Sequence, residues 1–353
     1  MKKIILTGGG TAGHVTPNLA LVPSLREKGY EVRYIGSYAG MERTLAEKAG
    51  LPYDGIASGK LRRYFDLKNF SDPFRVLKGY SQAKKLLKKN RPDIVFSKGG
   101  FVAVPVVLAA SHLHIPVIIH ESDMTPGLAN KLCISSASKV CCNFSETLKY
   151  LPAGKAVHTG CPIRAELLQG TRLAGLKLTG LNTNRPVLLI IGGSSGAVAV
   201  NQAVRAALPL LLEHFQIVHL CGRNHLDESL RQTPGYLQYE YMDEPLKDLF
   251  AMADVVISRA GANAICELLA LRKPALLIPL GKNASRGDQI LNAKSYESKG
   301  YCMVLPEEDA SPDRLLHDIL SLYENRSRYR QAMETAHDRN AVSRIVELIE
   351  ECR

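Results

Sequence analysis

The sequence contains no apolar run that approaches the roughly 18 residues of a membrane-spanning helix. At its start, MKKIILTGGGTAGH, a short apolar run leads straight into glycines, so we expect no signal peptide. The eight cysteines form no C-x-x-C pair and show no cysteine–histidine spacing of the kind that binds zinc. We therefore expect reduced, mostly buried thiols in a cytosolic protein without a membrane span.

Acidic residues are scarce in the first part of the chain. The whole sequence has 45 Lys and Arg against 34 Asp and Glu, a formal net charge of +11. Residues 1–160 hold 23 basic and 11 acidic side chains, whereas residues 161–353 hold 22 and 23. Residues 60–91 alone carry 11 basic and 2 acidic side chains. The excess is a local patch, which indicates an anionic partner such as a membrane surface, a nucleic acid or a phosphorylated molecule.

Short β-branched runs alternate with helix-length segments along the whole chain, a pattern typical of parallel α/β folds. The predicted strands cover residues 3–7, 31–35, 93–97, 116–120 and 139–142 in a first series, and 186–191, 216–220, 237–241, 254–258 and 274–279 in a second. We predict two Rossmann-like domains, residues 1–160 and 186–353, joined by a polar linker at 161–185. The helical pattern after residue 311 predicts helices that pack around the second domain or cross back to the first.

Both series begin with a buried strand, a glycine-rich turn and a helix, in KKIILTGGGTAGH and RPVLLIIGGSSGA. Such a turn lets a ligand approach the backbone N–H groups of a helix start. Gly8, Gly10 and Gly13 match the G-x-G-x-x-G pattern of dinucleotide-binding proteins. However, the second predicted strand ends in Gly36 and Ser37, where a nicotinamide dehydrogenase would place an acidic residue, so that function is disfavoured. A tight turn without a ligand is the structural alternative.

Two groups in the first domain are candidates for chemistry. His14 lies at the turn into the first helix, and the ordinary pKa of histidine suits it to accept a proton from a sugar hydroxyl. His120 and Glu121 lie at the carboxyl end of a predicted strand, the edge where open parallel sheets bind ligands. A packing histidine and a buried hydrogen-bond network are the structural alternatives.

Four later side chains are candidate contacts for a nucleotide sugar. Ser194 lies in the second glycine turn, where backbone donors and a helix start can stabilise a diphosphate leaving group. Arg164, in GCPIR, would add a cation. Glu267 can accept two hydrogen bonds from vicinal ribose hydroxyls, and the amide of Gln289 can hold sugar hydroxyls. A surface arginine and a carboxylate that caps a helix are the structural alternatives.

Taken together, seven segments resemble the MurG family of peptidoglycan glycosyltransferases, over essentially the whole chain. They are GGGTAGHVTP, FSKGGFVAVPVVLAA, IIHESDMTPGLANK, GCPIR, LLIIGGSSGAVAVNQ, SRAGANAICELLALRKP and SRGDQILNA. The resemblance implies an α/β GT-B fold, in which two Rossmann-like domains face each other across a cleft. It also implies transfer of N-acetylglucosamine (GlcNAc) from UDP-GlcNAc to the N-acetylmuramic acid (MurNAc) of lipid I, an undecaprenyl-diphosphate-linked pentapeptide sugar, which gives lipid II.

Carried over by position, the resemblance assigns contacts with UDP-GlcNAc to both domains. They are Thr11, Ala12, Gly13, Asp123, Arg164, Ser194, Asn201, Met242 beside Tyr241, Glu267 for the ribose, and Gln289. Three positions depart from residues frequent in the family: Ala12 stands for a glycine, Asp123 for an asparagine and Phe101 for a tyrosine. The tyrosine hydroxyl therefore has no counterpart here.

The implied reaction is an inverting displacement, in which the C4 hydroxyl of MurNAc attacks the anomeric carbon and UDP leaves. His14 is the first candidate for the catalytic base and Glu121 the second. No D-x-D-like pair stands at a predicted strand end. We therefore expect glycine turns, helix N-termini and Arg164 to stabilise the leaving group, with no metal ion and no cofactor.

The basic segment mixes cations with apolar side chains, which suits it to an anionic leaflet. The predicted docking residues are Lys60, Arg62, Arg63, Phe65, Phe70, Phe74, Lys78, Lys84 and Lys85. Because lipid I is held in a membrane, we expect a peripheral protein on the cytoplasmic face of the cell membrane, with no nucleic acid partner. Other cell-wall synthesis enzymes are further candidate partners, and a solvated helix face is the structural alternative.

Three rival functions use the same features. A UDP-GlcNAc 2-epimerase would share the fold and the nucleotide sugar but would need no lipid surface. A glycosyltransferase acting on another lipid, such as diacylglycerol, would keep the basic segment and change the acceptor. A nucleotide-sugar sensor would bind without turnover.

Overall fold

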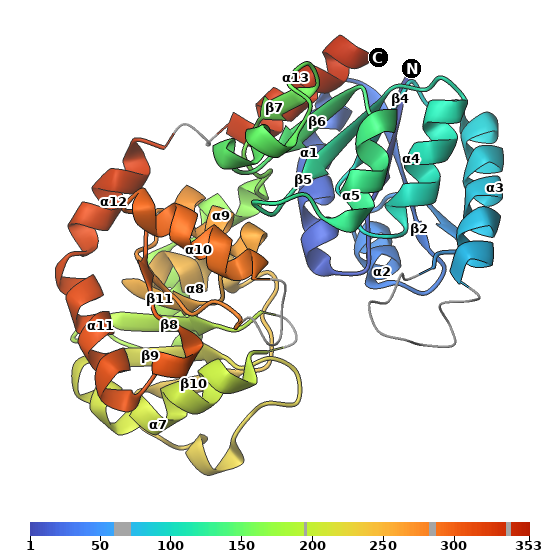
Figure 1. Cartoon of the computed structure of the whole chain (residues 1–353). Coiled ribbons are helices and arrows are strands. Elements are labelled where there is room, and N and C mark those ends of the chain that lie inside the picture. Colours follow the sequence, from blue (N-terminus) through green and yellow to red (C-terminus); the bar gives the residue numbers. More distant parts are fainter. Residues whose placement is uncertain (60–71, 194–195, 282–286, 337–339) are drawn as a thin grey trace. The chain divides into compact units, whose positions relative to one another are not determined.

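The computed structural model describes residues 1–59, 72–193, 196–281, 287–336 and 340–353. The chain divides into two compact units: unit 1 comprises Met1–Arg164 with Asp338–Arg353, and unit 2 comprises Ala165–His337. Each contains one wholly parallel sheet with helices on both faces (Figure 1). The predicted α/β class with two Rossmann-like sheets is confirmed.

Unit 1 alternates strands and helices from its first residue. Its strands are β1 (Lys2–Thr7), β2 (Tyr30–Ser37), β3 (Tyr53–Ile56), β4 (Ile94–Ser97), β5 (Val117–Glu121), β6 (Lys139–Cys142) and β7 (Ala156–His158). Its α-helices are α1 (Thr16–Glu27), α2 (Met41–Lys48), α3 (Asp72–Asn90), α4 (Ala103–His112), α5 (Leu128–Cys133) and α13 (Ala341–Cys352). The strand order β3-β2-β1-β4-β5-β6-β7 reverses direction between β1 and β4. Open parallel sheets bind ligands at such a switch point, outside the carboxyl ends of the strands.

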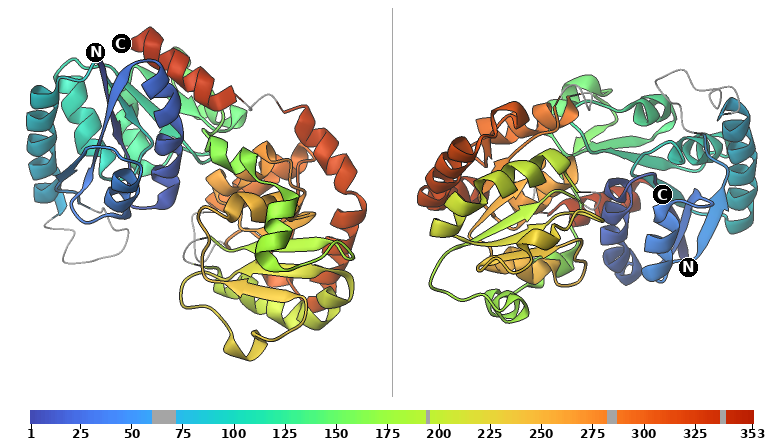
Figure 2. Two further views of the ribbon diagram at one scale, coloured as in Figure 1. Left: turned by 180° about the vertical axis from the view of Figure 1, so that it is seen from behind. Right: turned by 90° about the horizontal axis from the view of Figure 1, so that it is seen from below.

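The two faces of this sheet carry separate apolar cores because side chains alternate along each strand. Ile4 of β1 packs with α1 and α13, whereas Ile5 packs with α3 and α4. The C-terminal helix α13 therefore helps to cover one face of the sheet that contains the N-terminal strand. Both chain ends lie on unit 1 (Figure 2). An ion pair of 2.6 Å between Lys2 and Glu350 joins them.

Unit 2 repeats the plan with a smaller sheet. Its strands are β8 (Val187–Ile191), β9 (Gln216–Leu220), β10 (Tyr236–Tyr239), β11 (Val255–Ser258), β12 (Ala275–Leu277) and β13 (Met303–Val304), in the order β10-β9-β8-β11-β12-β13. Its α-helices are α6 (Arg172–Thr179), α7 (Val198–His214), α8 (Leu246–Met252), α9 (Ala262–Ala270), α10 (Asp288–Ser298), α11 (Pro312–Glu324) and α12 (Arg326–Glu334). Its switch point lies between β8 and β11.

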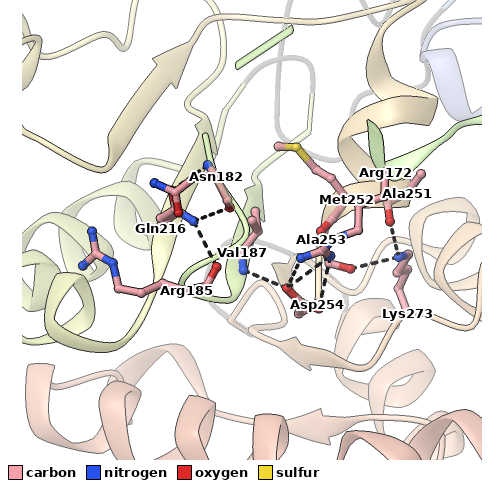
Figure 3. Close-up of polar contacts among 10 residues, drawn as sticks. All are labelled: Arg172, Asn182, Arg185, Val187, Gln216, Ala251, Met252, Ala253, Asp254 and Lys273. Carbon is pink, nitrogen blue, oxygen red and sulfur yellow. Dashed lines mark hydrogen bonds and ion pairs between the residues drawn. The ribbon is translucent and has the colours of Figure 1, made fainter. Parts of the chain in front are cut away.

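The segment expected to be a linker, residues 161–185, contains a 3₁₀ helix (Ala165–Gln169) and α6, and both pack on α8 of unit 2. Arg172 of α6 donates to the carbonyl of Met252, 2.7 Å away, and to the carboxylate of Asp254. Asp254 also accepts from the backbone N–H of Val187, the first residue of β8 (Figure 3). These bonds lie at the amino ends of the strands, so they fasten the segment at the edge opposite the one where parallel sheets bind ligands.

Three observed strands, β3, β7 and β13, are absent from the predicted set. Each is an edge strand of four residues or fewer, too short to show a clear periodicity. All eight cysteines are free, and all are buried except Cys352, which is half-buried. The prediction of mostly buried cysteines is confirmed. Within the described ranges, no helix is long and apolar enough to cross a membrane.

Candidate functional site

The first glycine loop joins β1 to α1 and carries His14. After Thr7 the chain turns through three glycines into a short 3₁₀ helix, Ala12–His14, which leads directly into α1. Thr11 is exposed, and His14 is half-buried. The Oγ1 of Thr11 and the Nδ1 of His14 lie 2.9 Å apart, so the threonine hydroxyl orients the ring. The structure thus brings together the four positions predicted on this loop.

The loop after β4, which contains Gly99 and Gly100, packs directly on the first glycine loop. The N–H of Lys98 donates to the carbonyl of Thr7, 3.0 Å away. Gly100 has φ +84°, and a Cβ there would overlap the carbonyl oxygen of Gly9. Only glycine meets both conditions without strain. The FSKGG motif therefore places backbone against backbone at the switch point of unit 1.

The electrostatic surroundings keep His14 neutral. Its pKa is lowered to about 4, first by burial and then by the positive charge of Lys98, while a hydrogen bond with the Gly9 backbone and the negative charge of Glu42 partly oppose this shift. At neutral pH the imidazole is therefore unprotonated and has a nitrogen lone pair available. This is the state that a general base requires.

His120 and Lys98 form a buried pair at the carboxyl ends of β5 and β4. The ammonium of Lys98 can only donate, so the Nδ1 of His120, 2.7 Å away, accepts. The Nε2–H of His120 then donates to the carbonyl of Gly160, 2.9 Å away. Burial, followed by the charge of Lys98, holds the pKa of His120 well below its usual range. Both ring nitrogens are thus engaged within the protein, which makes His120 a structural partner of Lys98.

Glu121 is buried at the end of β5 and accepts three hydrogen bonds. The donors are the N–H of Asp123 at 3.0 Å, the N–H of Gly127 at 3.0 Å and the side-chain amide of Asn130 at 2.8 Å. Burial raises the pKa of this carboxyl, while the three hydrogen bonds act in the opposite direction. The carboxylate therefore shapes the turn from residue 122 to 127, on which the half-buried Asp123 lies.

In unit 2, Asn201 lies near the start of α7, where its side chain is 2% exposed. Its amide N–H donates to the carbonyl of Cys221, 2.9 Å away, and its Oδ1 lies 3.0 Å from the Nε2 of His219. The hydroxyl of Tyr236 lies 2.8 Å from the Nδ1 of the same histidine. This network ties α7 to the end of β9, beside the second glycine loop, the one that follows β8 in unit 2.

The other predicted positions of the nucleotide-sugar site have varied surroundings. Glu267 is half-buried on α9, and Gln289, in the first turn of α10, accepts from the N–H of Leu280, 3.0 Å away. Tyr241 is 51% exposed after β10. Met242 is half-buried, as is Arg164, which ends the first segment of unit 1; Ser194 lies outside the described residues.

Sequence reasoning missed three buried polar residues of unit 1: Glu42, Lys98 and Asn130. Lys98 lies in the FSKGG motif, and a charged residue at the end of an apolar strand is a signal from which it could have been predicted. Glu42 had no such signal, because its reach to the first glycine loop depends on how α2 packs. In the described part of the chain, no cluster of three or more His, Cys, Asp or Glu is placed to hold a metal ion.

The described part of the basic segment forms α3, which packs on α4. Phe74 is 74% and Leu77 is 64% exposed, and Lys78 and Lys85 are exposed beside them, whereas Lys84 is half-buried. These positions recur at helical spacing, so one face of α3 combines large apolar groups with ammonium groups. Five predicted docking residues lie outside the described residues: Lys60, Arg62, Arg63, Phe65 and Phe70.

Comparisons with known proteins match the chain from end to end. Family models match residues 4–142, as the glycosyltransferase family 28 N-terminal domain, and residues 187–349, as the C-terminal domain of that family. A curated relative from Lachnospira eligens is 65% identical over 351 residues, 99% of either chain, and is named UDP-N-acetylglucosamine–N-acetylmuramyl-(pentapeptide) pyrophosphoryl-undecaprenol N-acetylglucosamine transferase.

Solved structures resemble both units. MurG of Acinetobacter baumannii is 27% identical, covers 99% of this chain and 100% of that one, and has a TM-score of 0.78. A UDP-GlcNAc 2-epimerase from Neisseria meningitidis, with the same coverage, has a TM-score of 0.69 at 16% identity. The latter likeness is one of fold alone.

Proposed function

We propose a site and a mechanism from the premise that this chain belongs to glycosyltransferase family 28, whose two domain models match both of its halves. It is a UDP-GlcNAc-dependent N-acetylglucosaminyltransferase, which moves GlcNAc to lipid I to form lipid II. The observation that carries this function is the 65% identity over 99% of both chains to a relative with that activity in its name.

His14 is the base that takes the proton of the MurNAc C4 hydroxyl. Its low pKa, caused first by burial, leaves the ring neutral and ready to accept. If Nε2 is the accepting atom, Nδ1 carries the ring proton and donates it to the Oγ1 of Thr11 at 2.9 Å, so that the threonine fixes the tautomer. Proton removal by a positioned base contributes about 10²–10⁴-fold in rate.

Glu121 supports this site without taking the proton. Three donors occupy three of the roughly four lone-pair sites of its carboxylate, and these hydrogen bonds act against the uptake of a proton. Its contribution is the fixed shape of the turn from 122 to 127, where Asp123 is a predicted sugar contact. Thr11, Ala12, Gly13 and Arg164 remain predicted contacts for UDP-GlcNAc in unit 1.

Unit 2 binds the nucleotide part of the donor at the carboxyl edge of its sheet. Glu267 on α9 and Gln289 on α10 both follow strand ends, where vicinal hydroxyls of ribose or sugar can meet a carboxylate and an amide. Gly193 and Ser194 precede α7, whose free N–H groups favour the charge of a leaving diphosphate. Asn201 acts here through the Cys221 carbonyl, since its amide is engaged in the core.

The exposed face of α3 docks the protein on the cytoplasmic face of the cell membrane. Phe74 and Leu77 offer apolar side chains to the interface, while Lys78 and Lys85 are attracted to anionic headgroups. Such docking holds unit 1 at the surface in which an undecaprenyl-linked acceptor lies. Other cell-wall synthesis enzymes are further partners in this proposal.

One assay tests the function. The purified full-length chain is incubated with radiolabelled UDP-GlcNAc and a lipid I analogue, and the lipid product is separated and counted. Label is expected in the lipid, and released UDP should match it in amount. Interconversion of free UDP-GlcNAc without acceptor would indicate an epimerase, and transfer to diacylglycerol but not to lipid I would indicate another lipid acceptor.

A further inference from the structure

Lys98 is a buried cation with neutral partners. Its side chain is 1% exposed at the end of β4, where the strand order of unit 1 reverses. The ammonium donates to the Nδ1 of His120 and to the Oγ of Ser122, 2.7 and 2.8 Å away. Among the described residues, no carboxylate forms an ion pair with it. Burying an ammonium without a counter-charge is costly, so its presence beside a candidate base calls for a functional explanation.

Glu42 is a buried anion on the other side of the same loop. Its side chain, at the start of α2, is 1% exposed. The Oε2 atom accepts from the N–H of Gly10 at 3.2 Å, and Oε1 accepts from the N–H and the hydroxyl of Ser37 at 3.0 and 2.5 Å. It fits there because Gly9 has no side chain: a Cβ on Gly9 would lie 2.5 Å from the carboxyl carbon. No basic side chain in the described part of the chain forms an ion pair with it.

Both charged residues are hydrogen-bonded to the loop that carries His14. Glu42 holds that loop at Gly10, and the backbone of Lys98 is bonded to Thr7, where the loop begins. Lys98 lowers the pKa of His14, and Glu42 raises it. From β2, the hydroxyl of Tyr34 donates to the Gly8 carbonyl, and burial raises its pKa far above neutral pH, so it adds no charge. The ring therefore lies in the field of two buried charges of opposite sign.

We propose that Lys98 and Glu42 are positioning residues of opposite charge that act on the reaction through His14. Lys98 keeps the imidazole in its neutral, proton-accepting form, and its hydrogen bonds hold His120 and Ser122 in place. Glu42 holds the first glycine loop and favours the imidazolium that forms when the substrate proton arrives. The inference rests on the proposed role of His14 as the base.

The test measures the ionisation of His14 directly, in the full-length chain. Histidine side chains are labelled with ¹⁵N, and the signal of His14 is identified by its loss in His14→Gln. Lys98→Met removes the charge and keeps the apolar stem, while Glu42→Gln keeps the shape of the carboxylate. Lys131→Met, at an exposed position of α5, is the matched control.

Opposite shifts are expected for the two variants. In Lys98→Met the midpoint of His14 should rise from about 4 toward 6.5, whereas in Glu42→Gln less of the ring should be protonated at about pH 4.5 than in the wild type. The acid limb of the kcat profile should move in the same direction as the midpoint in each variant. Lys98→Arg, which keeps the charge, should leave the midpoint close to that of the wild type, and so should Lys131→Met.

General damage to the fold cannot imitate this result, because it would move both variants the same way. Midpoints that stay fixed, or that shift in one common direction, overturn the proposal even when the wild-type chain transfers GlcNAc. If the midpoint of His14 shifts in opposite directions in the two variants but the pH profile of kcat does not change, the effect of the two charges is supported and the assignment of His14 as the base is overturned. If the midpoint shifts in opposite directions but the wild type transfers no GlcNAc to lipid I, only the proposed function is overturned.

Discussion

The ring of His219 shares a hydrogen bond of 3.0 Å with Oδ1 of Asn201 in the core of unit 2. The amide of Asn201 donates to the Cys221 carbonyl, so Oδ1 is the acceptor and the Nε2–H of His219 is the donor. A Cβ on Gly196 would overlap the same Cys221 carbonyl, so the second glycine loop packs against the group that Asn201 holds. One amide thereby connects α7, β9 and the loop where a diphosphate is proposed to bind.

Replacing Asn201 with Leu should therefore destabilise unit 2 and weaken UDP binding together. The change leaves a buried carbonyl and a buried N–H without their partner, which costs about 1–3 kcal/mol for each group. Thermal denaturation and calorimetric titration with UDP measure the two effects. Gln202→Leu, at the exposed neighbouring position on α7, is the control and should change neither. Weaker UDP binding with unchanged stability would show instead that Asn201 contacts the ligand directly.

His14→Ala should lower kcat about 10²–10⁴-fold and leave the Kd for UDP within about threefold. In the proposed mechanism the ring takes a proton, whereas the nucleotide part of the donor binds mainly to unit 2. Initial rates with the lipid I analogue and equilibrium binding of UDP give the two numbers. His317→Ala, at an exposed position of α11, should behave as the wild type. Turnover by His14→Ala equal to that of the wild type would remove His14 from the mechanism.

The protein should lose stability as the pH falls from about 6.5 toward 4. Burial lowers the pKa of His219 to about 3 and that of His14 to about 4, and it holds the pKa of His120 well below its usual range. In this window the unfolded chain binds protons at these positions and the folded chain does not, so protonation favours unfolding. Melting temperatures recorded across the range measure the loss.

The variant His219→Gln tests how much of this loss of stability in acid comes from the His219 ring. His219→Gln should be less stable at pH 7, because the buried network is disturbed, and its melting temperature should depend less on pH below 6.5. His214→Gln, at the exposed end of α7, is the control and should leave the slope as it is. Parallel curves for His219→Gln and the wild type would contradict the assignment.

Sedimentation with anionic vesicles should require the exposed face of α3. Phe74→Ser with Leu77→Ser removes the apolar contacts, and Lys78→Ala with Lys85→Ala removes charge worth about 1 kcal/mol per lysine near the surface, or roughly fivefold in binding each. Binding by the wild type should also fall steeply with salt. Leu173→Ser with Lys177→Ala on α6 is matched, since Leu173 is 77% exposed, and it should sediment as the wild type does. Equal sedimentation of the α3 and α6 variants would argue against docking by α3.

The sequence predicted the architecture well because the central strands are continuous runs of apolar, mostly β-branched residues. Leu188 to Ile190 in β8 and Ile118 to Ile119 in β5 are fully buried, and their runs stand out from the helical segments around them. The edge strand β13 has two residues, and its position follows from pairing with β12 rather than from its own pattern. Such an element depends on tertiary contacts that a single sequence does not display.

The residues of the candidate site also differ in whether the sequence alone could predict them. His14 could be found because a glycine turn after a strand marks a ligand edge wherever it occurs. The partners of Glu121 could not be found from the sequence, because Gly127 and Asn130 donate to its carboxylate only after the chain has turned back on itself. Glu42 and Ser37 likewise come together through the packing of α2 under the first loop.

The return of α13 to unit 1 sets the order in which the chain can mature during synthesis. Leu21 and Leu25 of α1 leave the ribosome early, yet Ile345 and Ile349, which belong to the same core, come from the last turns of the chain. At about 5–20 residues per second, the synthesis of unit 2, which comes in between, takes roughly 9–35 s. During that time unit 1 presents an uncovered apolar face. The first sheet to be synthesised is therefore the last to be covered on both faces, and a nascent chain halted before residue 341 exposes an apolar face of the kind that favours aggregation.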